Sequence, residues 1–256
     1  MSDSMSRPLE NTVALVTGGA RDIGAAIVRT LSAQGAAVVI NTAHSMARAE
    51  ALAAELEGAG GRALAVQADV TDPAAIDQML SRVRDAFGAT IHVLVNNAGG
   101  LVARKTMDAM DLAFWREVID LNLTSVFAVT KAVLPMMPDG GAIVNLSSLA
   151  ARDGGGGGAL AYSSAKGAVL TFTRGLAKEL APRRIRVNCV SPGLIATTFH
   201  DTFTAPAVRQ AVAGRTAVGR EGSAQDVANA VAFLASSASA YITGESLEIN
   251  GGLYFV

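Results

Sequence analysis

The sequence has one cysteine, few aromatic residues (5 %) and little charge, since Asp, Glu, Lys and Arg make up only 17 % of its 256 residues. The lone thiol, Cys189, excludes an internal disulfide and any metal site built from several thiolates, and we expect no bound metal. So little cysteine fits a reducing compartment, and the protein is expected to be cytoplasmic.

An excess of charge of one sign is also lacking, because the formal net charge is −1 and the isoelectric point is near 6.3. Nucleic acids and anionic membrane surfaces bind clustered Lys and Arg, so neither partner is expected. Apolar runs such as 36–40 and 93–95 fall far short of the roughly 20 residues that cross a bilayer, and no membrane span is expected. The polar stretch 1–11 lacks the apolar segment of a secretory signal and is predicted to be a frayed lead-in.

Half of the residues are hydrophobic, which is enough for a large core. Short apolar segments alternate with segments of helical period along the chain. Strands are predicted at 12–16, 36–40, 63–67, 91–95, 141–146, 185–190 and 246–249, and helices at 23–34, 46–57, 73–87, 112–136, 162–180 and 225–235. We therefore predict an α/β fold in which residues 1–256 form a single domain, a doubly wound (Rossmann) parallel sheet with helices on both faces.

The glycine run at 154–158 fits either a linker between domains or a mobile loop beside a pocket. The strand–helix alternation continues across it, which favours the loop.

A glycine-rich turn follows the first predicted strand. Its candidate binding residues are Thr17, Gly18, Ala20, Arg21, Ile23 and Gly24. Free backbone N–H groups and the positive end of a helix at this place favour a pyrophosphate, and the alternative is a tight connection without a ligand. Asp22 stands where a glycine is expected, and capping of the helix N-terminus is the role considered for it.

Tyr162 and Lys166 are one helical turn apart and emerge from the same face of a predicted helix. A fixed cation within about 4–6 Å lowers the pKa of a phenol from about 10 toward neutrality, where it exchanges protons readily. The alternative is an ordinary half-buried tyrosine beside a surface lysine.

Further motifs accompany this pair. In chain order they are Asp69-Val70, Asn97-Ala98-Gly99, Asn122, Ser148, Tyr162 with Lys166, and Ser191-Pro192-Gly193. With the glycine-rich turn, they make the chain resemble the short-chain dehydrogenase/reductase family over nearly its whole length. The resemblance implies that Asp69, Val70 and the Asn97-Ala98-Gly99 turn bind the cofactor.

The same resemblance implies that Tyr162 and Lys166 serve both catalysis and cofactor binding. Ser148 then binds the substrate oxygen, with Ser147 as the competing candidate. Asn122 holds a water that connects the lysine to solvent; its alternative is an amide bonded to its own helix.

The family pattern also assigns the nicotinamide carboxamide to the segment after the sixth predicted strand, through Pro192, Gly193, Ile195 and Thr197. The sequence Asn250-Gly251-Gly252 resembles the terminal strand of the family, which packs in a homotetramer.

The choice of cofactor depends on charge near the adenosine ribose, where a carboxylate would repel a 2′-phosphate. The second predicted strand ends instead near Asn41, His44 and Ser45, and Arg21 lies in the neighbouring turn. NADP(H) is favoured, with NAD(H) as the alternative. Asp22 weakens this inference because it can neutralise Arg21, and His44 is equally a solvated loop residue.

Arg104, Lys105 and His200 are candidate substrate residues. The basic side chains of Arg104 and Lys105 would suit a substrate carboxylate. The alternative is that Arg104 and Lys105 form a solvated loop edge. These segments resemble bacterial reductases that act on an alginate-derived deoxy-hexoseulose uronate. This resemblance implies that a hydride is transferred between NADP(H) and a small carbonyl or alcohol substrate, such as a keto sugar acid. The alternatives are a 3-oxoacyl thioester reductase and a non-catalytic nucleotide-binding regulator.

Overall fold

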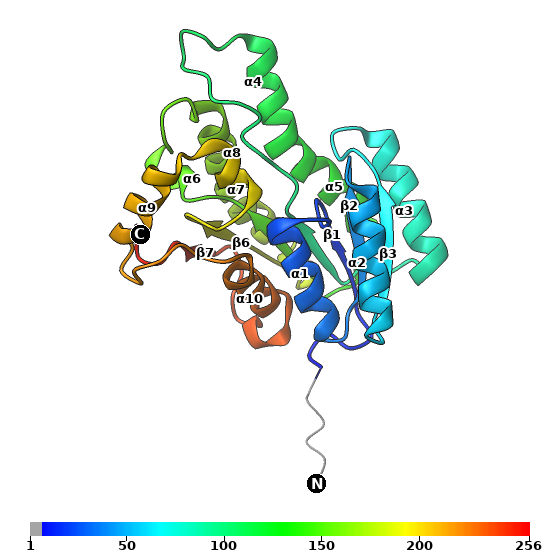
Figure 1. Cartoon of the computed structure of the whole chain (residues 1–256). Coiled ribbons are helices and arrows are strands. Elements are labelled where there is room, and N and C mark those ends of the chain that lie inside the picture. The colour runs from blue at the N-terminus through cyan, green and yellow to red at the C-terminus, as the bar shows by residue number, and fades with distance from the viewer. Residues whose placement is uncertain (1–6) are drawn as a thin grey trace.

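The computed structural model describes residues 7–256 and has a seven-stranded parallel sheet at its centre (Figure 1). The strands are β1 (Val13–Val16), β2 (Ala37–Thr42), β3 (Arg62–Gln67), β4 (Val93–Asn96), β5 (Ala142–Leu146), β6 (Arg186–Pro192) and β7 (Ser246–Ile249). They lie in the order β3-β2-β1-β4-β5-β6-β7, so the direction of winding reverses beside β1. A crevice opens at such a reversal, along the carboxyl ends of the strands.

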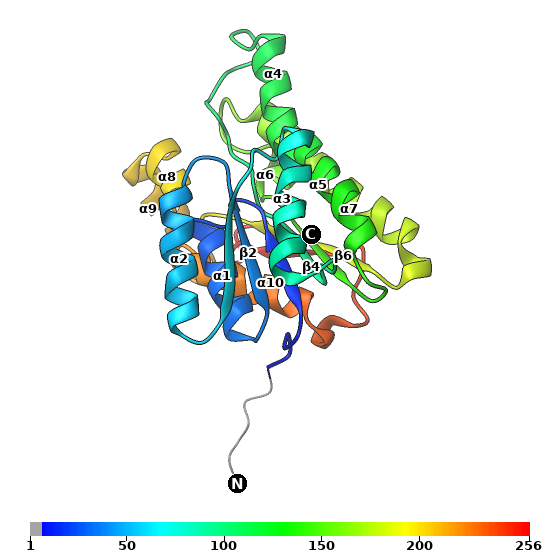
Figure 2. The same cartoon turned by 90° about the vertical axis from the view of Figure 1, so that its right-hand side faces the viewer.

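Helices cover both faces of this sheet, as Figures 1 and 2 show. The helices are α1 (Asp22–Ala33), α2 (Met46–Gly58), α3 (Pro73–Phe87), α4 (Leu112–Ile119), α5 (Ser125–Val133), α6 (Ala150–Asp153), α7 (Leu160–Glu179), α8 (Thr198–Phe203), α9 (Pro206–Arg215) and α10 (Ala224–Ala235). Four shorter helical turns are η1 (Asp120–Thr124), η2 (Leu134–Met136), η3 (Ala181–Arg183) and η4 (Ser237–Ser239). Helices α4, α6 and α8 lie beyond the carboxyl edge of the sheet in both views.

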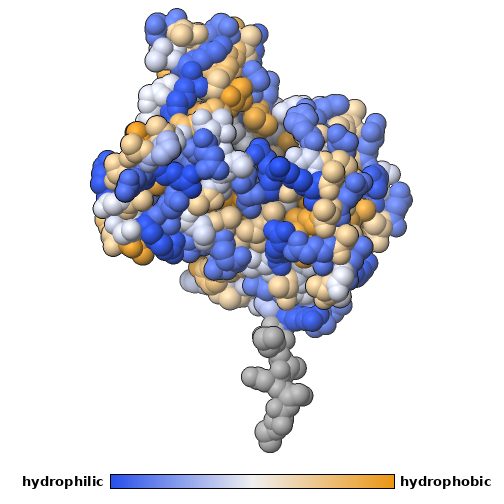
Figure 3. Space-filling view, in the orientation of Figure 1, coloured by the Kyte–Doolittle hydropathy of each residue, from blue (hydrophilic) through white to orange (hydrophobic). Residues whose placement is uncertain are grey.

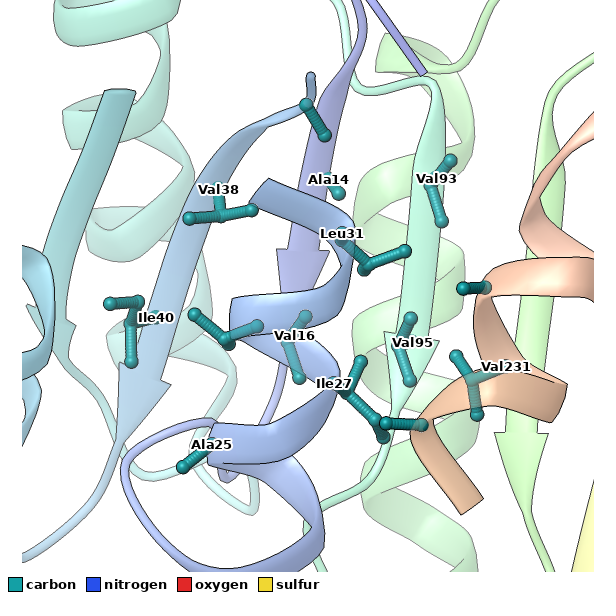
Figure 4. Packing of buried hydrophobic residues seen from close by; sticks show 14 of the residues in the cluster. Ala14, Val16, Ala25, Ile27, Leu31, Val38, Ile40, Val93, Val95 and Val231 are labelled. Atoms are coloured by element: carbon teal, nitrogen blue, oxygen red, sulfur yellow. The ribbon is translucent and has the colours of Figure 1, made fainter. Parts of the chain in front are cut away.

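Alternate residues of each strand enter two separate cores. On β1, Ala14 and Val16 pack with buried residues of α1, α2 and α10. Figure 4 shows them with residues of α1 and α10. Val13 and Leu15 face the other way and pack with α3, α5 and α7. Both faces of the sheet are therefore covered, which explains why its central strands β1, β2, β4 and β5 are buried along their whole length and largely apolar. The predicted doubly wound parallel fold is confirmed.

The N-terminal lead-in is partly described. Leu9 is buried in the core with α1, and its N–H donates to the carbonyl of Gln34 at 3.0 Å. Residues 1–6 of the predicted frayed stretch lie outside the described residues.

Residues Leu112–Met136 form one continuous helical stretch that is long and apolar enough to cross a membrane by length and composition, with a mean hydropathy of 1.4. The length of uninterrupted apolar runs in the sequence did not reveal this stretch, because charged residues such as Arg116 interrupt its apolar residues. Its segments pack against α3 and α7, and a core helix passes the same test, so the stretch is weak evidence for a membrane span. Figure 3 shows polar residues interspersed with apolar ones over the face formed by α1, α2 and α10.

Candidate active site

An open cleft of about 1940 Å³ runs along the carboxyl edge of the sheet. Ordinary small-molecule pockets have about 300–1,000 Å³, so this cleft has room for a dinucleotide and a substrate together. The predicted residues that line it are Gly18, Ala20, Arg21, Ile23, Gly24, Asn41, His44, Ser45, Asp69, Val70, Asn97, Ala98, Gly99, Arg104, Ser148, Tyr162, Lys166, Pro192, Gly193, Ile195, Thr197 and His200. Thr17, Lys105 and Asn122 are not among the lining residues.

The glycine-rich turn is held from behind by Thr17 and Asn97. The Thr17 hydroxyl accepts hydrogen bonds from the N–H groups of Asn97 and Ala98, both at 3.0 Å. The Asn97 side-chain amide donates to the carbonyls of Thr17 and Gly18 at 2.9 and 3.0 Å. Thr17 thus shapes the turn without facing the cleft.

The turn also requires glycine at two positions. Gly18 has a φ of +61°, in the left-handed region. A Cβ added to Gly24 would lie 2.1 Å from the Gly18 carbonyl oxygen. The backbone therefore closes tightly into the first turn of α1, and this cradle fits the pyrophosphate of a dinucleotide.

The end of β2 supports the turn with an amide in place of a carboxylate. Asn41 is 1 % exposed, accepts from the Gly18 N–H at 3.3 Å and donates to the Ala68 carbonyl at 3.0 Å. The rim of the cleft carries Arg48 as well as the predicted His44. Sequence reasoning missed Arg48, although an arginine in the first turn of the helix after the second strand was a usable signal.

Asp69 and Val70 lie at the end of β3. The hydroxyl and the backbone N–H of Thr71 both donate to the Asp69 carboxylate, at 2.8 and 2.9 Å. These hydrogen bonds lower the pKa of Asp69, so its carboxylate stays ionised and fixed in a tight turn.

Three side chains of the expected catalytic set meet in the cleft. Ser148 follows β5, and Tyr162 and Lys166 project from α7. Lys166 is only 4 % exposed, and its Nζ donates to the Leu146 carbonyl at 2.8 Å. The Ser147 hydroxyl donates to the Lys166 carbonyl at 2.8 Å, which fastens α7 to β5. Ser147 is thus engaged in packing, whereas Ser148 is half-exposed to the cleft.

The predicted lowering of the Tyr162 pKa by Lys166 is not found. Burial raises the pKa of Tyr162, and a hydrogen bond with Ser148 offsets part of this rise. Burial also lowers the pKa of Lys166 to about 8. The sequence reasoning counted the attraction of the cation and neglected the loss of water around both groups. At neutral pH Tyr162 is therefore a protonated phenol, the form that donates a proton to a substrate oxygen.

Asn122 lies behind this group in η1, a π-helical segment between α4 and α5. It is fully buried; its amide donates to the carbonyls of Gly100 and Val118 at 2.8 and 2.9 Å, and its Oδ1 accepts from the Gly100 N–H at 3.0 Å. A Cβ on Gly99 would lie 2.7 Å from Asn122 Oδ1 and 3.1 Å from Lys166 Nζ. Asn122 thus flanks Gly99 beside the lysine and ties the loop after β4 to the helix.

The segment after β6 is supported by the loop after β7. A Cβ on Gly193 would lie 2.8 Å from the Cβ of Asn250, so the two loops are in close contact. Ile195 forms an isolated bridge with Gly222. The segment predicted to bind the nicotinamide is therefore held in place by its contacts with Asn250 and Gly222.

The structure brings the candidate substrate residues Arg104 and His200 to the cleft but leaves Lys105 outside its lining. Lys105 Nζ lies 4.4 Å from the Phe114 ring centroid and 4.0 Å from the Asp111 carboxylate, outside the cleft lining. His200 lines the cleft, and burial lowers its pKa, which keeps the imidazole neutral at pH 7. Its Nδ1 lies 2.9 Å from the Thr204 hydroxyl.

Arg104 joins two walls of the cleft. Its Nη1 donates to the Gly157 carbonyl at 2.8 Å, and its Nε donates to the Phe203 carbonyl at 3.2 Å. The glycine run 154–158 forms the loop between α6 and α7, and Arg104 connects this loop to the end of α8. Two of the five N–H groups of this guanidinium are thus already used by the backbone.

Comparison with known proteins agrees with this geometry. A family model described as enoyl-(acyl carrier protein) reductase matches residues 18–254. The 3-oxoacyl-[acyl-carrier-protein] reductase FabG of Escherichia coli (strain K12) is 43 % identical over 249 residues, which cover 96 % of this chain and 99 % of that protein. The 3-oxoacyl-[acyl-carrier-protein] reductase of Synechocystis sp. is 44 % identical over 245 residues, covering 94 % and 96 %.

Solved structures of related proteins have the same fold. A short-chain dehydrogenase from Burkholderia cenocepacia J2315 in complex with NADP has a TM-score of 0.90 at 38 % identity, covering 96 % of this chain and 99 % of that chain. A blue fluorescent protein from a metagenomic library in complex with NADPH has a TM-score of 0.89 at 38 % identity, covering 97 % and 100 %. The resemblance drawn from the sequence motifs is confirmed, and the chain belongs to the short-chain dehydrogenase/reductase family of NAD(P)-dependent oxidoreductases that act on a CH–OH or C=O group.

Proposed function

We propose that this protein reduces the 3-keto group of an acyl thioester with NADPH. The observation that carries the proposal is that Ser148, Tyr162 and Lys166 meet in one cleft whose lining is partly apolar. Its apolar lining residues include Leu101, Leu149, Phe199, Phe203 and Val212. Such a wall suits an acyl chain, and the relatives from Escherichia coli and Synechocystis carry this activity in their names.

The chain's own residues supply the proton side of the reaction. NADPH, when bound, supplies the hydride. The Tyr162 hydroxyl donates its proton to the carbonyl oxygen, and the Ser148 hydroxyl donates a hydrogen bond to the same oxygen as negative charge develops there. Lys166, an ammonium below pH 8, stabilises the phenolate that Tyr162 leaves behind. Asn122 holds the loop beside Lys166 in place.

The preference for NADPH over NADH rests on charge at the rim of the cleft. Arg48 lies in the first turn of α2, where the helix dipole disfavours a cation. A 2′-phosphate beside this helix N-terminus would offset that cost and bind the guanidinium. The buried Asn41 provides no carboxylate to repel it. Arg21 also lines the cleft, where its guanidinium donates to the Thr198 hydroxyl at 2.8 Å.

The keto sugar acid is the second candidate, favoured by Arg104 in the cleft lining. Lys105 does not join Arg104 there, and Arg104 already binds two backbone carbonyls, so one guanidinium with reduced capacity would have to hold the carboxylate. Because the cleft offers so little positive charge to a substrate carboxylate, the keto sugar acid is a weaker candidate than the 3-oxoacyl thioester.

Three further expectations stay predictions: one domain over residues 1–256, a homotetramer and a cytoplasmic location.

The test is a comparison of substrates with both cofactors. Purified protein is assayed for NADPH and NADH oxidation with acetoacetyl-CoA, a longer 3-oxoacyl thioester and a keto sugar acid. The proposal expects the highest kcat/KM for a thioester with NADPH. A higher kcat/KM for the keto sugar acid would transfer the assignment to it. Saturable NADPH binding without turnover of any carbonyl would favour the regulator.

A further inference from the structure

Asp22 lines the cleft at the glycine-rich turn, but the proposed binding of the cofactor gives its carboxylate no role. It occupies the place where a glycine is expected, and its φ is +50°, in the left-handed region that residues other than glycine rarely adopt. The side chain does not cap α1, the helix that it begins, as the sequence analysis had considered. A strained backbone with an acidic side chain beside a phosphate cradle requires another explanation.

The Asp22 carboxylate binds the start of α8, which is 176 residues away in the chain. Oδ1 accepts from the Thr198 N–H at 3.1 Å. Oδ2 accepts from the Thr198 hydroxyl. The same hydroxyl accepts from Arg21 Nη1 at 2.8 Å, so Arg21, Asp22 and Thr198 form a closed group that we call the Asp22 latch.

Helix α8 forms the substrate side of the cleft. Its Phe199 ring lies 6.0 Å from the Tyr162 ring and 5.2 Å from the Phe203 ring, measured between centroids. Phe199, His200 and Phe203 all line the cleft. The position of α8 therefore sets the wall that faces Tyr162.

Two arginines bind the C-terminal half of α8. Arg104 donates to the Phe203 carbonyl, and Arg209 donates to the Asp201 carboxylate at 2.5 Å. At the near end, the latch binds both the first N–H and the first side chain of the helix. The carboxylate thus links the cofactor turn directly to the substrate wall.

We propose that Asp22 is a positioning residue for the carbonyl substrate, which acts through Thr198 to hold α8 and the Phe199 ring in place beside Tyr162. This inference rests on the proposed function for its kinetic readout, but its structural readout does not need a substrate.

The test compares three variants of the latch: Asp22→Gly, Asp22→Asn and Thr198→Ser. Asp22→Gly removes the carboxylate and relieves the left-handed backbone, so it keeps the fold. Asp22→Asn keeps an acceptor for the Thr198 N–H and tolerates a positive φ. The measurements are KM and kcat for acetoacetyl-CoA, the NADPH dissociation constant by fluorescence titration, and amide hydrogen exchange of residues 198–203 without substrate.

Loss of hydrogen bonds to a charged acceptor is expected to raise KM in Asp22→Gly by about tenfold and to speed exchange at 198–203 by a similar factor. The NADPH dissociation constant should change less than about twofold by the same reasoning, because the latch binds α8 and leaves the backbone cradle intact. Asp22→Asn should fall between Asp22→Gly and the parent protein, and Thr198→Ser, which keeps the hydroxyl, should retain the parent KM.

Unchanged exchange at 198–203 in Asp22→Gly would overturn the proposal. A changed NADPH dissociation constant with an unchanged KM would also overturn it, because Asp22 would then act on the cofactor. If the parent protein fails to reduce any thioester, the proposed function fails, and the exchange measurement still decides the role of the latch.

Discussion

Substitution of the buried lysine provides a quantitative prediction. Lys166 is 4 % exposed, and burial lowers its pKa from 10.5 to about 8. Each pKa unit corresponds to 1.36 kcal/mol, so keeping this ammonium charged in the fold costs about 3 kcal/mol at pH 7. Lys166→Met replaces it with an unbranched apolar side chain. The replacement removes that cost but leaves the Leu146 carbonyl without its donor, which costs about 1–3 kcal/mol.

The pH dependence separates these two effects. Between pH 8 and 10.5 the unfolded lysine binds more protons than the folded one, so the stability of the parent protein rises with pH through this window. The variant lacks this gain. The unfolding free energy of Lys166→Met, taken relative to the parent, should therefore fall by about 3 kcal/mol across the window, whatever its value at pH 7.

Urea unfolding of both proteins at pH 7, 8, 9 and 10 provides the measurement, and a parallel activity assay should show the variant to be inactive. Other groups that titrate at high pH and lie away from Lys166 are shared by the two proteins and cancel in the difference. A difference in unfolding free energy that stays constant with pH would refute the conclusion that Lys166 is buried as a charged group at neutral pH.

Two other substitutions test separate parts of the site, and a third tests an ion pair outside the cleft lining, in which Arg152 of α6 lies 2.8 Å from Glu248 of β7. Arg48→Ala should raise the KM for NADPH by about tenfold and leave that for NADH unchanged, and equal effects on both would contradict a 2′-phosphate contact. Gly24→Ala places a Cβ 2.1 Å from the Gly18 carbonyl oxygen, so thermal unfolding should show a loss of about 1–3 kcal/mol together with weaker NADPH binding; a protein unchanged in both would contradict the tight turn. Arg152→Met leaves Glu248 unpaired in a site where the two side chains are 16 % and 12 % exposed, and should destabilise the protein by about 3–5 kcal/mol, whereas Arg152→Met with Glu248→Leu should recover most of that loss in urea unfolding.

The fold follows from local features of the sequence. Most strands are short segments rich in apolar residues, and the predicted segment 73–87 begins and ends where α3 does. The capping residue Asp72, whose side chain accepts from the Ala74 N–H, and Pro73 mark the start of that helix in the sequence itself. Parallel alternation then leaves few arrangements of the sheet.

The parts of the site that sequence could not provide depend on contacts between distant segments. The Asp22–Thr198 contact joins residues 176 apart, and nothing near Asp22 in the sequence announces Thr198. The π-helical segment at Asn122 depends on its bonds to the Gly100 backbone. The pKa of Tyr162 depends on burial, which a helical spacing alone does not reveal.

The central claim is that the Tyr162 hydroxyl donates the proton that completes carbonyl reduction. The direct measurement is single-turnover oxidation of bound NADPH by acetoacetyl-CoA in the parent protein and in Tyr162→Phe. We predict that the variant binds NADPH as the parent does and that its rate of oxidation falls by a factor of about 10²–10⁴. A variant that oxidises NADPH at the parent rate would contradict the claim.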